Sequence, residues 1–337
     1  MLRSVKTHAL LKTAICSLDQ IIANASLQLI GERGALLSFL FHGLFQDEGE
    51  LSAGVVDPQQ GVTVEMFGSF IGHFKNQSYK FISPADIMEG LQPQGKYVLI
   101  TFDDGYYNNV RALPVLEEFD VPAVFFISTD HVRRGKAYWW DVIFREFGRR
   151  GRTKDEVRVA QNKCKRLKTG AVEAWLKAEF GEHSLTPVGE LDRPFSKSEL
   201  GKFANHRLVV LGNHTKDHAI LTNYSTAEIS EQIQGAQDAI GEMTGKFPDI
   251  IAYPNGEYSE DIMQMAQAAG LSLGVVVEPG KNKVPIRALA REAMRMKRFI
   301  IWGNSGIDAQ CRASRSDISL YRTLKQIHFI TRAGFSY

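Results

Sequence analysis

The chain has 337 residues, of which 44% are hydrophobic and 23% are charged, and its formal net charge is +2. This composition is typical of a folded globular protein with one large core or two smaller ones. The near-neutral charge and the lack of a long Lys/Arg tract give no reason to expect a nucleic-acid partner. The three cysteines, Cys16, Cys164 and Cys311, are far apart. They predict neither a disulfide framework nor a cysteine metal site, and reduced thiols fit a cytoplasmic setting.

The first 34 residues predict an amphipathic helical segment ahead of the main domain. Apolar residues recur at helical spacing over residues 11–29. Lys12 and Asp19 interrupt the apolar core that a signal peptide needs, which favours a cytoplasmic protein. We expect the helix to pack on the domain, and the alternative is peripheral association of residues 9–30 with the inner face of a membrane. No stretch reaches the ~18 apolar residues of a membrane span.

Seven short apolar runs predict strands, most of them separated by helical segments. Repeated strand–helix alternation predicts a parallel sheet, and about seven units is close to the number that closes into a barrel. We therefore expect an α/β barrel over residues 35–303, followed by a tail without a clear motif over residues 304–337. The predicted strands are residues 36–41, 97–102, 123–127, 207–211, 250–253, 273–277 and 299–302.

Helices are expected between these strands. A capping-box sequence at residues 225–228 opens a helix that lasts to about Gly245, and another covers residues 259–269, with Gly270 as its C-terminal stop. A third begins near Asn108. An apolar helical face is formed by Phe67, Phe70, Ile71 and Phe74.

The alternation lapses over residues 142–200, where the chain is basic and rich in helical sequence, including Lys163, Lys165 and Arg166. We interpret this stretch as a helical insertion on one barrel loop. It forms either one wall of a substrate groove or a solvated, charged subdomain.

Two adjacent carboxylates, Asp103 and Asp104, directly follow the predicted strand 97–102, and Gly105 after them permits a turn. Two ionised carboxylates at a buried strand end repel each other and are costly to desolvate, so they need a cation or a polar network. The alternative is that the pair only caps the next helix, because helix N-termini favour Asp.

Two histidines, His214 and His218, follow the predicted strand 207–211. On a helical turn, residues four apart lie on one face and can direct nitrogen atoms at one ion. Because α/β folds gather catalytic residues at the carboxyl ends of strands, one Asp and two His could form a three-ligand site there. Such a site suits zinc or a similar divalent transition metal more than calcium or magnesium.

Three ordered motifs resemble the polysaccharide deacetylases, the carbohydrate esterase group with a NodB-type domain. They are residues 101–105 (TFDDG), 212–218 (GNHTKDH) and 252–256 (AYPNG), and the likeness extends over about residues 36–302. The resemblance implies a distorted (β/α)7 barrel that removes N-acetyl, or sometimes O-acetyl, groups from amino-sugar polymers. It also implies a divalent metal that activates water, with Zn²⁺ expected first and Co²⁺, Ni²⁺, Mn²⁺ or Fe²⁺ as alternatives.

The resemblance assigns roles to the residues at matching positions. Asp103 would be the base that activates the water, while Asp104, His214 and His218 would hold the metal. The backbone N–H of Asn255 would donate to the oxyanion. Polarised carbonyl, activated water and oxyanion donor are what an amide hydrolase needs.

One position departs from the family pattern in the third motif. Usual members open this motif with an arginine that orients the base, whereas this chain has Ala252. We expect Arg298, just before the last predicted strand, to orient Asp103 instead, with Arg295 as the second candidate.

A second departure concerns the general acid, because the C-terminal Leu-x-His motif of usual members is missing. His42 has this spacing at the end of the first predicted strand. The first and last strands of a closed barrel are neighbours, so the chain resembles the circularly permuted deacetylases of exopolysaccharide systems. We expect His42 to protonate the leaving amine, with His328 as the fallback.

The leading hypothesis is a deacetylase acting on an N-acetylated glycan or glycan precursor, and the sequence gives no oligomeric state. A related amidase on a small cyclic or linear amide, and an inactive carbohydrate-binding homologue, are the alternatives. Aromatic rings near the site could stack on sugar faces, although core packing is the alternative for one of the tryptophans. The expected substrate contacts are Tyr106, Trp139, Trp140, Tyr253 and Pro254.

Overall fold

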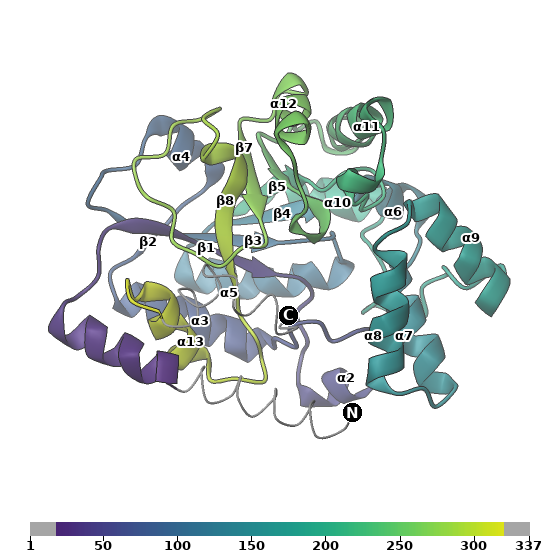
Figure 1. The fold of residues 1–337 in the computed structure, drawn as a ribbon, viewed down its shortest axis with the longest axis horizontal. Coiled ribbons are helices and arrows are strands. Elements are labelled where there is room, and N and C mark those ends of the chain that lie inside the picture. The colour runs from purple at the N-terminus through teal and green to yellow at the C-terminus, as the bar shows by residue number, and fades with distance from the viewer. Residues whose placement is uncertain (1–17, 320–337) are drawn as a thin grey trace.

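The computed structural model describes residues 18–319 of the chain, which fold around one parallel sheet (Figure 1). Strand β1 pairs with β3 as well as with β8, so seven strands close into a barrel. The two-residue β2 is added beside β3. The predicted α/β barrel is therefore confirmed. Within the described residues the strands are β1 (Ala35–Phe41), β2 (Lys80–Phe81), β3 (Lys96–Phe102), β4 (Ala123–Ile127), β5 (Val209–Asn213), β6 (Ile250–Ala252), β7 (Leu273–Val276) and β8 (Met296–Ile300).

Some strand ends differ from the predicted ranges. β5 begins two residues later than expected because the Val209 N–H bonds back to the His206 carbonyl (3.0 Å) in a turn. β8 begins three residues earlier than expected, so Arg298 lies inside the strand rather than before it. β2 is too short for a hydrophobic pattern to reveal.

Side chains of the barrel strands alternate between the interior and the outer face. One buried cluster joins alternate residues of different strands, including Leu36, Leu99, Phe126 and Met296. Residues at the intervening strand positions, such as Phe39, Ile100 and Phe125, lie in a separate cluster with residues of the helices. Arg298 follows Met296 by two residues, so it also points into the barrel.

Helices cover the outside of the barrel. The predicted apolar face of α3 is fully buried, and the predicted capping box opens α11. α5 begins at Ala112, after a 3-10 turn, and not near Asn108. The helices are α2 (Glu48–Ser52), α3 (Val64–Asn76), α4 (Pro84–Glu89), α5 (Ala112–Phe119), α6 (Thr129–Arg134), α7 (Trp139–Arg149), α8 (Lys154–Cys164), α9 (Thr169–Phe180), α10 (Lys197–Ala204), α11 (Thr226–Thr244), α12 (Glu260–Ala268) and α13 (Ile307–Arg315), with 3-10 segments η1 (Tyr107–Arg111), η2 (Leu221–Asn223), η3 (Pro254–Gly256) and η4 (Ala293–Arg295).

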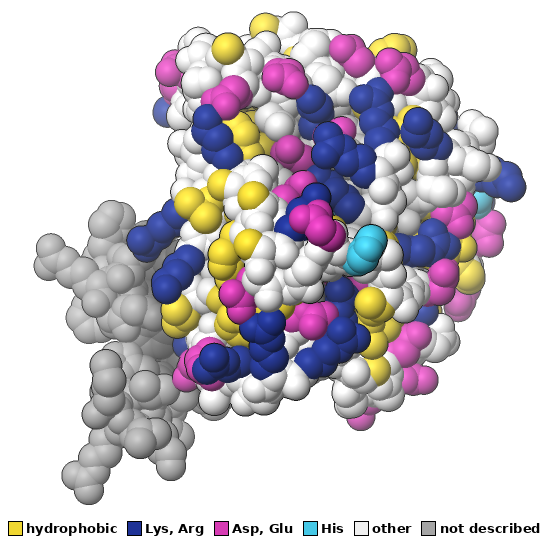
Figure 2. Space-filling view, turned by 90° about the vertical axis from the view of Figure 1, so that its right-hand side faces the viewer, with side chains coloured by type: hydrophobic (Ala, Val, Ile, Leu, Met, Phe, Trp, Pro, Cys, Tyr) yellow, Lys and Arg dark blue, Asp and Glu magenta, His cyan; other side chains and the backbone are white. Residues whose placement is uncertain are grey.

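The helical insertion between β4 and β5 lies beside the barrel, where α7, α8 and α9 pack together (Figure 1). It has an apolar core of its own that includes Trp140, Val172 and Leu176. Lys and Arg side chains are spread over this side of the molecule with Asp and Glu between them (Figure 2). The insertion therefore combines a packed interior with a charged outer surface.

The N-terminal segment includes a helix over residues 18–29. Its packed face contains Asp19, Ala23 and Ser26, whereas Ile21 and Leu29 are 65% and 86% exposed. Ile21 and Leu29, which belong to the apolar face that the sequence predicts to pack, therefore point outward.

The described part of the tail contains α13, which packs against α3. Cys164 and Cys311 are buried free thiols, while Cys16 and His328 lie outside the described residues. None of the helices in residues 18–319 combines the length and the hydropathy that a membrane crossing requires.

Candidate active site and metal centre

Two carboxylates follow the end of β3. The Asp103 N–H donates to the carbonyl of Phe41 in β1 (2.9 Å), which ties the segment to the neighbouring strand. Asp104 has a φ of +76° and Gly105 one of +85°, so the chain turns sharply after the pair. A Cβ at Gly105 would come within 3.2 Å of the Ile127 side chain, and the positive φ also favours glycine.

Two imidazoles reach the same place from a tight turn after β5. The sequence pattern placed His214 and His218 on a helical turn, but the structure has no helix there. Thr215 and His218 instead have positive φ values, of +63° and +54°. The Asn213 side chain stabilises the turn by accepting a hydrogen bond from the Thr215 N–H (2.9 Å). The four-residue spacing still brings both rings together, with centroids 4.9 Å apart.

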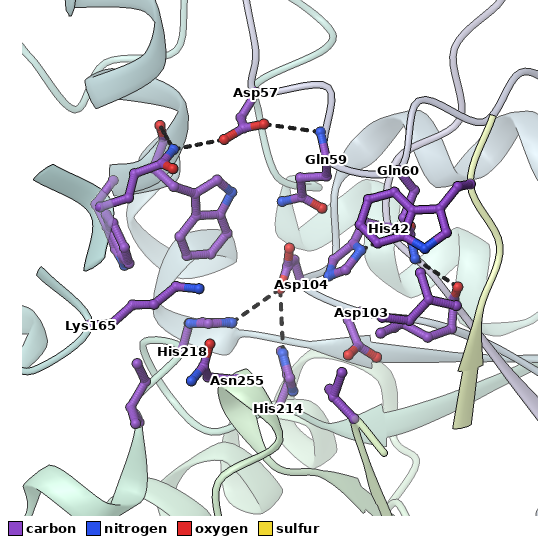
Figure 3. A pocket seen from close by; sticks show the side chains of 18 residues that line it. His42, Asp57, Gln59, Gln60, Asp103, Asp104, Lys165, His214, His218 and Asn255 are labelled. Carbon is purple, nitrogen blue, oxygen red and sulfur yellow. Dashed lines mark hydrogen bonds and ion pairs between the residues drawn. The ribbon is translucent and has the colours of Figure 1, made fainter. Parts of the chain in front are cut away.

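The three side chains predicted to hold a metal converge (Figure 3). Asp104 Oδ1 lies 3.4 Å from Nε2 of both His214 and His218. Apart from these two nitrogens, neither oxygen of this buried carboxylate has a partner in the described residues, and an unpaired buried charge is costly. His214 Nδ1 lies 2.8 Å from the Ala252 carbonyl, so it donates there and leaves the Nε2 lone pair toward Asp104. This donor set fits a divalent cation.

The surroundings of the cluster keep Asp104 ionised and His218 neutral, which are the forms that a cation requires. Burial raises the pKa of Asp104, but the neighbouring imidazoles outweigh it and hold that pKa below its usual range. Burial lowers the pKa of His218 to about 3, so this imidazole is neutral at pH 7. Burial also lowers the pKa of His214, but Asp104 and Asp103 outweigh burial and raise it. The two aspartates thus favour the protonated form of His214, whereas burial favours the neutral form of His218.

Asp103 is held by an arginine from the opposite end of the sequence. Arg298 is fully buried and donates from Nη1 to Asp103 Oδ1 (2.6 Å) and from Nη2 to Oδ2 (2.8 Å). The guanidinium also donates to Thr101 Oγ1 and to the Val276 carbonyl. Burial raises the pKa of Asp103, but Arg298 and nearby imidazoles outweigh it and lower that pKa. Arg298 therefore contacts Asp103 directly from within β8, whereas Arg295 lies before β8, in η4.

His42 lies at the end of β1, in the wall of the same cavity. Its Nδ1 is 3.0 Å from Gln60 Oε1, while Gln60 Nε2 donates to the Leu40 carbonyl (2.8 Å). Because a carbonyl can only accept, this pair of contacts makes the amide oxygen face the ring and makes Nδ1 the donor. His42 Nε2 is then left for the cavity.

Asn255, in η3, also lines the cavity. It has a φ of +59°, in the left-handed region that Asn tolerates. Its side chain donates to Glu257 Oε1 (2.8 Å), whereas its backbone N–H has no acceptor among residues 18–319. A free N–H at the cavity wall is a suitable donor to a developing oxyanion.

The cavity over these groups has a volume of about 240 Å³. It is smaller than the ~300–1,000 Å³ of typical small-molecule sites, so it accommodates one end of a substrate. Sequence reasoning missed several wall residues, because they come from loops and from the insertion without a periodic pattern. These residues include Asp57, Gln59, Gln60, Gln161, Lys165 and Trp302.

Two of the five expected substrate contacts line the cavity. Trp139 and Trp140 do so, and the Trp140 ring centroid is 4.6 Å from that of His218. Tyr253 and Pro254 are buried in the fold, and the Tyr253 ring stacks on Tyr258.

Tyr106 also lies outside the cavity wall, because its hydroxyl is occupied within the protein. It donates to Asp141 Oδ2 (2.7 Å) and accepts from Trp140 Nε1 (2.7 Å). Tyr106 therefore supports Trp140 from behind, and Tyr106, Tyr253 and Pro254, which were expected to contact substrate, do not line this cavity.

The chain is similar to known proteins over most of this fold. Residues 90–274 match the family model described as polysaccharide deacetylase. YxkH of Bacillus subtilis (strain 168), whose name places it among polysaccharide deacetylases, is 23% identical over 219 residues, which is 63% of this chain and 58% of YxkH. The match thus spans less than two thirds of that relative.

Two solved structures share the fold. The Streptococcus pyogenes deacetylase PplD in complex with acetate has a TM-score of 0.56 at 16% identity, with 84% of this chain and 98% of PplD covered. IcaB from Ammonifex degensii has a TM-score of 0.54 at 16% identity, with the same two coverages. At these identities the likeness concerns the fold.

Proposed function

Because the chain belongs to the polysaccharide deacetylase family, we propose that it removes N-acetyl groups from amino sugars of a polysaccharide, glycan or glycan precursor. The observation that carries this proposal is the convergence of two arrangements at one cavity. The Asp104–His214–His218 cluster lies beside Asp103, which Arg298 holds through both oxygens. A family member with both arrangements has the groups that amide hydrolysis requires.

The donor set favours zinc among the divalent metals, with Co²⁺, Ni²⁺, Mn²⁺ and Fe²⁺ as alternatives. One carboxylate and two imidazoles leave coordination positions open, as in catalytic zinc sites. A cation held by Asp104, His214 and His218 would polarise the acetyl carbonyl and lower the pKa of a water molecule.

The remaining groups then act on protons and on developing charge. Asp103, kept ionised and oriented by Arg298, takes a proton from the attacking water. The Asn255 N–H donates to the oxygen that becomes negative. His42, held through Nδ1 by Gln60, delivers a proton from Nε2 to the leaving amine nitrogen. Together these roles complete the hydrolysis of an amide.

Chelation is the direct test of this function. Treatment with a chelator should reduce acetate release to background, and added zinc or cobalt should restore it, because Asp104 and its two histidines would lose their common ion. The measurement is acetate release from monomeric, oligomeric and lipid-linked N-acetyl sugars, with metal content followed in parallel. Full turnover by metal-free protein would contradict the proposal. Hydrolysis of small cyclic or linear amides alone would support the amidase, and glycan binding without acetate release would support the inactive homologue.

Replacement of His42 by Ala should lower kcat on N-acetyl sugars by about 10²-fold, because the amine would leave without its acid. The same variant should hydrolyse an aryl acetate nearly as well as the unchanged protein, since that leaving group needs no proton. His206→Ala is the matched control, because His206 pairs with Glu117 at the surface. Unchanged amide turnover in His42→Ala would rule out its role as the acid.

A further inference from the structure

The cavity wall contains a lysine that the proposed reaction does not use. Lys165 follows α8 directly, in the helical insertion. Among the cavity-lining residues in the described part of the chain, it is the one Lys or Arg. Its side chain extends from the insertion toward Asp104 and His218 (Figure 3). The insertion thus places one cationic group opposite the candidate catalytic groups.

The Lys165 ammonium makes no hydrogen bond or ion pair within residues 18–319. The nearby Asp57 bonds to other groups, since its Oδ1 accepts from the Gln59 N–H (3.0 Å) and its Oδ2 from Gln161 Nε2 (2.7 Å). By contrast, Lys168 in the same loop pairs with both oxygens of Glu228, at 2.6 and 2.9 Å. The cavity lysine is therefore available to a ligand.

The backbone that carries this lysine is held in place. The Lys165 N–H bonds to the Gln161 carbonyl (3.0 Å), which continues the helical turn of α8. Asn223, in η2, donates from Nδ2 to the carbonyls of Lys165 (2.9 Å) and Leu167 (3.2 Å). Because η2 follows the turn that carries His218, these contacts connect the end of the insertion to the candidate metal centre. The side chain thus starts from a fixed point beside the cavity.

The environment of the ammonium favours a negatively charged ligand. Lys165 is a solvent-exposed residue whose side chain lines the cavity, so a ligand bound there can reach the ammonium. A hydrogen bond from an ammonium to an anionic oxygen is stronger than one to a neutral oxygen. The tryptophans and glutamines of the wall offer contacts to a sugar ring but no charge for such a partner.

We propose that Lys165 binds an anionic substituent, a phosphate or a carboxylate, on the N-acetylated sugar whose acetyl group lies over Asp104, His214 and His218. This inference rests on the proposed function and narrows its substrate to an acidic amino sugar or an N-acetylated sugar phosphate. The helical insertion is then the part of the fold that selects the substrate.

The test uses the zinc-loaded Asp103→Asn protein, which binds substrate without turning it over. Calorimetric affinities are measured for N-acetylglucosamine, its 1-phosphate, its 6-phosphate and N-acetylmuramic acid, which carries a carboxylate. At least one anionic sugar should bind about 10-fold or more tightly than the neutral one. The tightest ligand identifies the anion and its position. Equal affinities for all four sugars would overturn the proposal.

A second set of variants assigns any preference to the lysine. In the same Asp103→Asn background, Lys165→Met should remove the anion preference and leave the affinity for the neutral sugar unchanged, whereas Lys165→Arg should retain it. Lys163→Met is the matched control, because Lys163 is exposed like Lys165 but does not line the cavity. A preference that survives in Lys165→Met comes from another group, such as the zinc ion, and overturns the proposal.

Failure of this inference can be told from failure of the proposed function. Acetate release by the unchanged protein reports the deacetylase activity, whatever the charge preference. If acetate is released but Lys165→Met binds every sugar as before, only the substrate assignment fails. If no acetate is released from any sugar, the function fails, while the affinities still decide the role of Lys165.

Discussion

Replacing Asp103 by Asn should lower acetate turnover by about 10³–10⁴-fold while leaving the metal content of the protein unchanged. An amide is nearly isosteric with the carboxylate but cannot take a proton from water. The metal should remain because Asp104, not Asp103, lies beside both histidine Nε2 atoms. The measurements are kcat on an N-acetyl sugar and zinc per chain by elemental analysis.

The complementary variant is His214→Ala, which should lose both turnover and metal. Comparing the two variants distinguishes loss of the base, which stops proton transfer, from loss of a metal ligand, which removes the cation. If Asp103→Asn lost its zinc, or if it kept full turnover, the division of labour between Asp103 and Asp104 would be wrong.

Replacing Arg298 by Met should destabilise the fold by about 3–5 kcal/mol, because it leaves the buried Asp103 carboxylate without its partner. Urea unfolding at pH 7 measures this cost. Arg298→Lys should be intermediate, since an ammonium keeps the charge but cannot hold both oxygens in one plane. Arg295→Met is the control, because Arg295 precedes β8 and has no recorded contact with Asp103 in the described residues. A cost below 1 kcal/mol would show that the ion pair does not stabilise the protein.

The same variant should also change the pH dependence of the protein. The pKa of Asp103 is lowered in the folded state, so its contribution to stability is present above the ordinary Asp pKa and is lost as pH falls through the lowered value. Arg298→Met should raise that pKa, so the acid limb of kcat/KM should move to higher pH. An unchanged acid limb would mean that Arg298 does not tune the base.

The sequence predicts the centre of the site better than its walls. The two aspartates follow a strand with a clear apolar pattern, and barrel closure implies that the first and last strands meet. The structure pairs Phe39 with Phe299, which brings β8 beside β1, so that His42 lines the cavity while Arg298 contacts Asp103 in its wall. Strand pattern and chain order indicate which strand ends meet, and the family resemblance indicates which residue types to expect there.

Other features depend on tertiary contacts that have no local pattern. Gln60 meets His42 from a loop 18 residues later in the chain, and nothing in the spacing indicates this. In the histidine turn, which has positive φ values, the side chains of Asn213 and Thr215 accept hydrogen bonds from the backbone N–H groups of Thr215 and Ala219. Tyr253 is part of the third motif but is fully buried. Proximity in sequence therefore overstated its access to substrate.

The closed barrel also affects how the site tolerates rearrangement of the gene. A ring of strands has no intrinsic beginning, and the contact between β1 and β8 is the same kind of parallel pairing as any other in the ring. Arg298 and His42 need only to lie on adjacent strands, whichever of the two strands is translated first. A gene rearranged so that β8 is translated directly before β1 would encode the same constellation, with Asp103 still meeting its arginine across the interior.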